Sequence, residues 1–299
     1  MKPIQRIFIM NYFYYFTGDL PNYLKISINS LLTVEEEAKI YLCSDNNPNY
    51  KNIDYLNPLD FQSSITKEFI DLDIYKNTAY EKNLNPLWSS SILRIFAISD
   101  FLKYTQLNET VHFDSDVIVY KPFEDLKNCL SNDAINITKL SADRLIFGYS
   151  FIQNFKIIEK VCIEIIEYFK SDNYLNNEYY KNHPLNEMEI LSKIQQKLPM
   201  LFKLLPDLPY GNQGTVFDPA GYGQYLGGTF NNPKKWYKRK QPILDHSVGQ
   251  EISSNRISVG FKGNTPTVSY KEKKIPIANL HIHSKDLFKF KPKNYREFI

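Results

Sequence analysis

The sequence is poor in the features that would assign it to several common protein classes. It has only three cysteines in 299 residues, Cys43, Cys129 and Cys162, and they lie far apart in apolar surroundings without the spacing of a metal site. An odd number of separated cysteines argues against a disulfide framework. We therefore expect reduced thiols in a cytoplasmic protein.

Long apolar runs and a strong charge imbalance are missing too. No segment approaches the roughly 18 apolar residues of a membrane-spanning helix. The apolar N-terminal segment is interrupted by Asn11 and Asp19 and shows no signal-peptide cleavage site. The net charge of +3 is too small to predict nucleic-acid binding over the surface. These features predict a soluble protein, or one held peripherally at the inner face of a membrane.

The overall composition is typical of a globular protein, with 43% hydrophobic and 23% charged residues, so the chain can bury a sizeable core. A strand that runs into an aromatic loop over 5–16, a helix over 20–32 and a strand over 38–43 open a parallel α/β sheet. No repeat or linker follows, so we expect a single domain over 1–299. Further helices are predicted over 60–82, 85–102, 155–170 and 185–198, strands over 134–139, 145–153 and 278–285, and a loop over 174–180.

Ligands of parallel α/β sheets bind at the carboxyl ends of the strands. The predicted strands place Asn11 and Tyr12 at the end of the first strand and Ser44 at the end of the second. These residues are candidates for binding a nucleoside. The alternative is that the sheet simply places two ordinary loops there.

The stretch His112-Phe113-Asp114-Ser115-Asp116-Val117-Ile118-Val119-Tyr120 brings two carboxylates to the mouth of a buried strand. Such carboxylates repel each other at neutral pH and call for a compensating cation. Divalent magnesium or manganese prefers oxygen ligands and leaves positions for substrate phosphates. Asp114 and Asp116 are therefore predicted to bind a divalent metal.

Other charged residues could complete this site. His281 and His283 fall on one face of a short predicted strand, and manganese accepts imidazole, so either could be a further metal ligand. Lys285 could then neutralise a diphosphate. Arg94 lies within a mostly apolar helix, where its guanidinium needs an anionic partner, which could be a phosphate, Asp100 or Asp116.

The C-terminal third is less regular. Residues 218–229 contain four of the chain's eleven glycines, a concentration that predicts close approach to something bound, and we expect Asp218 and Tyr222 to face it. Residues 234–240 are basic and aromatic, which is typical of a solvated loop. The alternative is contact with an anionic acceptor or a lipid headgroup.

Residues 89–94 followed by 112–122 resemble the core of GT-A-fold glycosyltransferases, and most closely the bacterial enzymes that build capsular or lipopolysaccharide glycans. Residues 147–154 are similar to that family's strand beneath the donor sugar. Residues 186–189 are similar to its helix start that contacts this sugar, and residues 281–285 to its C-terminal histidine and lysine element.

The resemblance implies a GT-A fold, with a mostly parallel central sheet flanked by helices. A nucleotide-binding half over 1–125 would end in the D-x-D motif, and 126–299 would bind the donor sugar and the acceptor. It implies a nucleotide-sugar donor, commonly a UDP-sugar, with Mn²⁺ or Mg²⁺ between the diphosphate and the two aspartates. Arg94, Ser115 and Lys285 would contribute to donor binding, together with Asn11, Tyr12 and Ser44 at the predicted strand ends. Glu187 would contact the donor sugar and is a candidate for catalysis, as is Asp218, which lies in a segment without a counterpart in the family.

Several alternatives stay open from the sequence. An inverting enzyme would need a carboxylate base, for which Glu187, Glu189, Asp218 and Asp245 are candidates. The acceptor would be a glycan or a lipid-linked glycan. Paired aspartates also suit a metal-dependent nucleotidyl- or phosphotransferase, although no glycine-rich basic motif occurs in the first 50 residues. A carbohydrate-binding domain without catalysis is the third interpretation.

Overall fold

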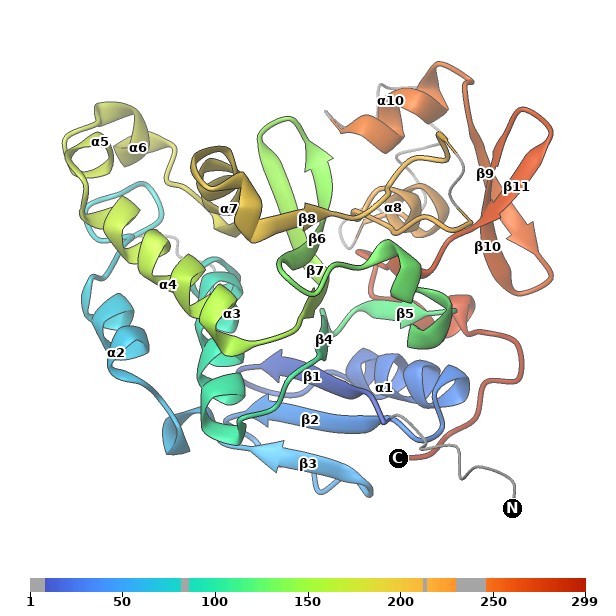
Figure 1. Ribbon diagram of the computed structural model, residues 1–299, viewed down its shortest axis with the longest axis horizontal. Helices are drawn as coiled ribbons and strands as arrows, with labels where there is room; N and C mark the ends of the chain where they lie inside the picture. Colours follow the sequence, from blue (N-terminus) through green and yellow to red (C-terminus); the bar gives the residue numbers. More distant parts are fainter. Residues whose placement is uncertain (1–8, 82–85, 212–213, 230–245) are drawn as a thin grey trace.

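The structure is a computed structural model and describes residues 9–81, 86–211, 214–229 and 246–299. Its centre is a sheet of seven strands, and among these strands β7 runs antiparallel to both of its neighbours whereas all other neighbouring pairs are parallel. The strand order is β3 (Ile53–Leu56), β2 (Lys39–Ser44), β1 (Asn11–Phe16), β4 (Thr110–Phe113), β7 (Arg144–Ile152), β6 (Ile135–Ser141) and β8 (Phe202–Leu204) (Figure 1).

Helices cover both faces of this sheet, because apolar side chains of β1 point alternately to one face and to the other. The side chain of Phe13 packs into one apolar core, whereas Tyr12 and Tyr14 pack into the other. The first core is covered by α2 (Ser64–Asp71), α3 (Pro86–Thr105), α4 (Phe155–Lys170) and α7 (Glu187–Lys197). The second is covered by α1 (Asn22–Val34) (Figure 1). The predicted α/β fold with a mostly parallel central sheet flanked by helices is confirmed.

The C-terminal part of the chain returns to the middle of the molecule. Strand β12 (Asn279–His281) pairs antiparallel with β5 (Val117–Val119), and His281 lies opposite Val117. This pairing brings the end of the chain beside the aspartates that follow β4. The remaining elements there are α8 (Tyr222–Gly227), α10 (Ser247–Ser253) and the sheet of β9 (Ser258–Lys262), β10 (Thr265–Tyr270) and β11 (Lys273–Pro276).

Three predicted element boundaries are wrong. The helix expected over 60–82 is restricted to α2, because Asp73 adopts a positive φ of 43° just after it. The loop expected over 174–180 contains two short helices, α5 (Asp172–Leu175) and α6 (Glu178–Asn182), the second capped by the side chain of Asn177. The strand expected over 278–285 ends at His281, so His283 lies beyond it.

Single turns of 3₁₀ helix connect several of these elements: η1 (Pro58–Asp60), η2 (Phe123–Asp125), η3 (Lys127–Cys129), η4 (Pro199–Leu201) and η5 (Leu287–Phe290). Among the described helices, none combines the length and the apolar character needed to cross a bilayer. The central sheet takes strands from both sides of residue 125. The division of one domain into a nucleotide-binding half over 1–125 and a second half over 126–299 stays a prediction.

Candidate metal and nucleotide site

A cavity of about 600 Å³ opens at the carboxyl ends of β1 and β4. Its walls come from segments that are far apart in the sequence: residues 15–17 at the end of β1, the first turns of α3, residues 114–116 after β4, and residues 186–188 at the start of α7. His281, His283 and Lys285 close it from the C-terminal side. Cavities of this size hold small-molecule ligands and cofactors.

The two aspartates are fixed at this cavity by backbone hydrogen bonds. The amide of Asp114 donates to the carbonyl of Gly148 at 3.0 Å, and the carbonyl of Asp116 accepts from the amide of Ile282 at 2.9 Å. The side chain of Asp116 is only 4% exposed, and its carboxylate contacts His281 Nε2 at 3.0 Å and the ammonium of Lys285. Burial opposes ionisation of Asp116, but the charges of His281 and Lys285 outweigh it and hold its pKa well below the usual value.

Asp114, Asp116 and His281 can offer one ligand atom each, and these atoms all lie within 4.8 Å of one another. His281 Nε2 is 3.7 Å from Asp114 Oδ2, and His281 Nδ1 is buried without a hydrogen-bond partner among the described residues. A Cβ atom at Gly148 would lie 2.9 Å from His281 Nδ1 and 3.0 Å from Asp114 Oδ2, so the cluster needs a glycine there. Two carboxylates and an imidazole are a donor set that fits manganese or magnesium.

His283 stands apart from this three-residue group. Its Nδ1 atom pairs with Nε2 of Gln224 at 2.8 Å, and its ring contacts that of His281 edge-on at 4.5 Å. Burial, followed by the charge of His281, lowers the pKa of His283 to about 3, so the imidazole is neutral. The arrangement makes His281 the histidine next to both aspartates.

Arg94 joins two carboxylates across the cavity. One guanidinium nitrogen contacts Asp114, and Nη2 bonds Glu187 Oε1 at 2.7 Å. The Arg94 side chain is only 11% exposed, and its Nε atom is buried without a partner in the described part of the chain. Burial raises the pKa of Glu187, and the charge of Arg94 opposes that rise. The protein partners expected for Arg94 were Asp100 and Asp116, and the structure provides Asp114 and Glu187 instead.

Asp100 is occupied elsewhere. It accepts hydrogen bonds from the amide of Ser63 at 3.1 Å and from the hydroxyl of Thr66 at 2.6 Å, so its carboxylate is held at the start of α2. A histidine that sequence reasoning did not select lies beside Asp114. His112 Nε2 is 3.7 Å from Asp114 Oδ1, and burial lowers the pKa of His112 well below the usual value. In the sequence, the feature that could have identified His112 as a site residue is its position two residues before Asp114.

The structure does not bring Asp218 and Tyr222 to the cavity. The Asp218 carboxylate accepts from the amides of Tyr222 and Gly223 at 2.8 Å and of His281 at 2.9 Å. The Tyr222 ring is fully buried, and its hydroxyl donates to the carbonyl of Asp207 at 2.7 Å. A Cβ atom at Gly223 would lie 2.0 Å from the His281 carbonyl. The close approach at Gly223 is therefore to β12, where Asp218 positions the backbone of His281.

The three residues predicted to contact a nucleoside do not line this cavity. Strand β1 begins at Asn11 instead of ending near it, and the Asn11 amide donates to the carbonyl of Asn108 at 3.3 Å. Tyr12 is buried against Phe113, at 5.6 Å between ring centroids. Ser44 is buried at the end of β2. None of the three lines the cavity, and the residues that do so at the end of β1 are Tyr15, Phe16 and Thr17.

Ser115, Lys285 and Glu187, by contrast, line the cavity with the aspartates and Arg94. The Lys285 side chain is 33% exposed, and its ammonium lies 5.4 Å from the ring centroid of Tyr23. The basic, aromatic stretch 234–240 and Asp245 lie outside the described residues.

The sequence matches no protein-family model and no curated protein. Several solved glycosyltransferase structures are similar in fold. The galactosyltransferase LgtC, in complex with donor and acceptor sugar analogues, has a TM-score of 0.48 and 10% identity over 91% of this chain and 87% of its own. Mouse xyloside xylosyltransferase 1 has a TM-score of 0.45 and 11% identity over 67% of this chain and 86% of its own.

The glycosyltransferase GlyE of Streptococcus pneumoniae TIGR4 has a TM-score of 0.39 and 16% identity. That match covers 67% of this chain and 45% of GlyE, so this chain spans less than half of that structure. Because these TM-scores lie below 0.5 and the identities below 25%, function rests on the geometry of the cavity.

Proposed function

We propose that this chain is a metal-dependent glycosyltransferase of GT-A type that transfers a sugar from a nucleotide-diphosphate donor, a UDP-sugar, to a glycan acceptor. The observation that carries the proposal is the convergence of Asp114, Asp116 and His281 at a cavity at the carboxyl ends of parallel strands, with the cation of Lys285 beside them. The resemblance of residues 112–122 to bacterial capsule and lipopolysaccharide transferases supports the same conclusion.

Asp114, Asp116 and His281 would hold Mn²⁺ or Mg²⁺. When bound, the ion stabilises the negative charge that develops on the leaving diphosphate. Lys285 is partly exposed at the cavity, so its ammonium can bind the same diphosphate. Arg94 holds the Asp114 carboxylate in place through its ion pair.

Glu187 is proposed to contact the sugar that is transferred. In the described lining of the cavity it is the one carboxylate besides the aspartate pair. Its Oε1 atom is held by Arg94 at 2.7 Å, which fixes the side chain at the start of α7. Asp218 acts as a positioning residue, because its contact with the site is the hydrogen bond from the backbone of His281.

The donor nucleoside is assigned to the end of β1, where Tyr15, Phe16 and Thr17 line the cavity. The proposal includes a glycan or lipid-linked glycan as acceptor. It also includes action in the cytoplasm, with contact at the inner face of the membrane.

The test is metal-dependent binding and cleavage of nucleotide sugars. A thermal-shift screen of UDP-, GDP- and CMP-sugars with manganese, followed by a donor-hydrolysis assay, should identify a UDP-sugar that stabilises the protein and is cleaved. Asp116→Asn should abolish both effects, because one aspartate cannot hold the ion alone. Asp133→Asn, at an exposed aspartate outside the cavity, is the matched control. Absence of cleavage together with unchanged nucleotide affinity in Asp116→Asn would refute the proposed function.

A further inference from the structure

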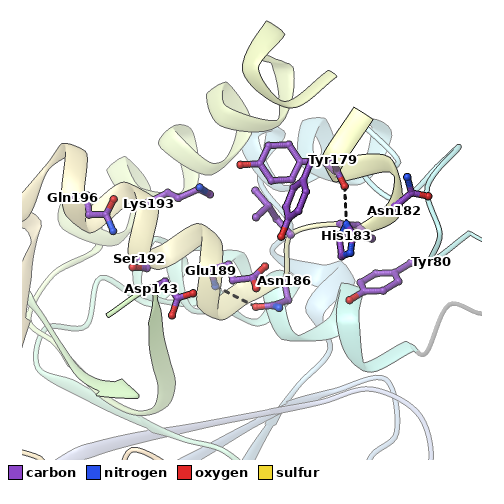
Figure 2. A pocket seen from close by; sticks show the side chains of 13 residues that line it. Tyr80, Asp143, Tyr179, Asn182, His183, Asn186, Glu189, Ser192, Lys193 and Gln196 are labelled. Atoms are coloured by element: carbon purple, nitrogen blue, oxygen red, sulfur yellow. Dashed lines mark hydrogen bonds between the residues drawn. The ribbon is translucent and has the colours of Figure 1, made fainter. Parts of the chain in front are cut away.

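A second cavity of about 360 Å³ lies between α6 and α7 (Figure 2). Asn186, immediately before α7, lines both this cavity and the donor cavity. Residues 189, 192, 193 and 196 of α7 face the second cavity, as the spacing of one helical face requires. Glu187 belongs to the donor cavity because residues two positions apart point about 200° apart around a helix. The start of α7 therefore forms a wall shared by two cavities.

Aromatic rings form one side of the second cavity. Tyr179 is 61% exposed, and its ring stacks on that of His183, with 4.5 Å between centroids and 15° between planes. The ring of Tyr80 stacks in the same way on Trp88, at 5.3 Å and 16°. Trp88 also lines the donor cavity, so this pair is a second connection between the two cavities. Because each ring is held by its neighbour, the aromatic wall is preorganised.

Polar groups of both charges form the other side (Figure 2). The ammonium of Lys193 lies 5.8 Å from the ring centroid of Tyr180 and forms no salt bridge with any residue that the structure describes. Glu189 and Asp143 add carboxylates, and Gln196 adds an amide that can both donate and accept. A site with charges of both signs does not select a polyanion such as a nucleotide. It suits a neutral ligand with many hydroxyl groups.

We propose that this second cavity is a saccharide subsite that binds an uncharged sugar unit of the acceptor glycan. A sugar ring presents a C–H face that packs against an aromatic ring such as Tyr179, and hydroxyl groups at its edge that pair with donors and acceptors. The cavity volume lies within the range of ligand pockets, about 300–1,000 Å³. The proposal rests on the proposed function, since the acceptor chain would pass Asn186 to place its reacting hydroxyl in the donor cavity.

The experiment measures saccharide binding separately from donor chemistry. The probes are neutral disaccharides and tetrasaccharides of glucose, galactose and N-acetylglucosamine, titrated calorimetrically into the wild-type protein and into Asp116→Asn, whose donor site is disabled. We expect a tetrasaccharide to bind both proteins. Tyr179→Ala should weaken that binding about five- to tenfold, the usual strength of one aromatic contact, and should leave donor hydrolysis unchanged.

Tyr104→Ala is the matched control. Tyr104 is 64% exposed and its ring stacks on Phe61 at 5.6 Å, so it resembles Tyr179 in exposure and contacts but lies outside both cavities. This variant should bind saccharide as the wild type does. No binding of any probe, or equal binding by the Tyr179 and Tyr104 variants, would overturn the subsite even if donor hydrolysis is present. Tyr179-dependent binding without donor hydrolysis would instead refute the proposed function and leave the cavity as a saccharide site.

Discussion

Replacing Arg94 with methionine tests whether this cation holds the site together. The substitution keeps most of the side-chain volume but removes the charge that faces Asp114 and Glu187. The Arg94 side chain is 11% exposed and that of Glu187 8%, so the variant leaves carboxylates largely buried without their cation. Removing one partner of a buried ion pair costs about 3–5 kcal/mol. The melting temperature should fall by roughly 6–10 °C, at about 2 °C per kcal/mol for a chain of this size.

The loss should depend on pH in a definite direction. Burial raises the pKa of Glu187 even while Arg94 opposes that rise, so removing Arg94 raises it further. A carboxyl group with a higher pKa in the folded than in the unfolded protein binds its proton more tightly when folded. Its contribution to stability is complete below the unfolded pKa and is lost as the pH rises through the folded pKa. Arg94→Met should therefore lose more stability at pH 8 than at pH 5, by about 1 kcal/mol or more.

Chemical denaturation at pH 5 and pH 8 provides the measurement. Arg256→Met is the control, because the Arg256 side chain is 58% exposed in its pair with Glu251 and exposed pairs contribute at most about 1 kcal/mol. The double variant Arg94→Met/Glu187→Gln should recover part of the loss, since the uncompensated charge of Glu187 is gone. A loss at Arg94 no larger than at Arg256, or one that is independent of pH, would refute the reasoning.

Two further predictions concern the geometry around the aspartates. His281→Ala should abolish manganese-dependent UDP binding, whereas His283→Ala should weaken it less than about tenfold, because of these two histidines it is His281 that lies within ligand reach of both carboxylates. Equal effects of the two substitutions in a calorimetric titration would contradict this assignment. Gly148→Ala should weaken manganese binding and cost about 1–3 kcal/mol of stability, because its methyl group would displace His281 and Asp114. Titration of the variant with manganese, beside a denaturation curve, checks both effects, and unchanged metal affinity would show that the close contact is not needed.

Much of the fold could be predicted because its signals are local. The apolar spacing of α1 and α4 and the strand before Asp114 lie within short windows of sequence, and the elements formed near the expected residues. The first strand shows the limit. Residues buried on both faces form a continuous apolar run that carries no signal for its ends. The end of the strand was therefore expected near Asn11 and Tyr12, whereas β1 begins at Asn11 and the cavity is lined by Tyr15 and Phe16.

Glycine-rich composition was misleading for a related reason. The sequence indicates that the backbone must be approached closely near Gly223, but it does not identify the approaching group. The structure shows that this group is the carbonyl of His281. The carboxylate of Asp218 accepts hydrogen bonds from the amides of Gly223 and His281, which lie on the two sides of this contact. A glycine needed for packing against the protein's own backbone is indistinguishable in sequence from one needed for a ligand.

The sequence by itself determined that two carboxylates follow a buried strand at Asp114 and Asp116 and that a cation is needed beside them. Only the tertiary structure decided which cations those are. Lys285 is 169 positions from Asp116, and Arg94 is 93 positions from Glu187. Periodicity reports the conformation of neighbouring residues, whereas these pairs exist because β12 pairs with β5 and α7 packs near α3 around a shared core. Such contacts arise from the packing of the whole chain, and no short window of sequence contains them.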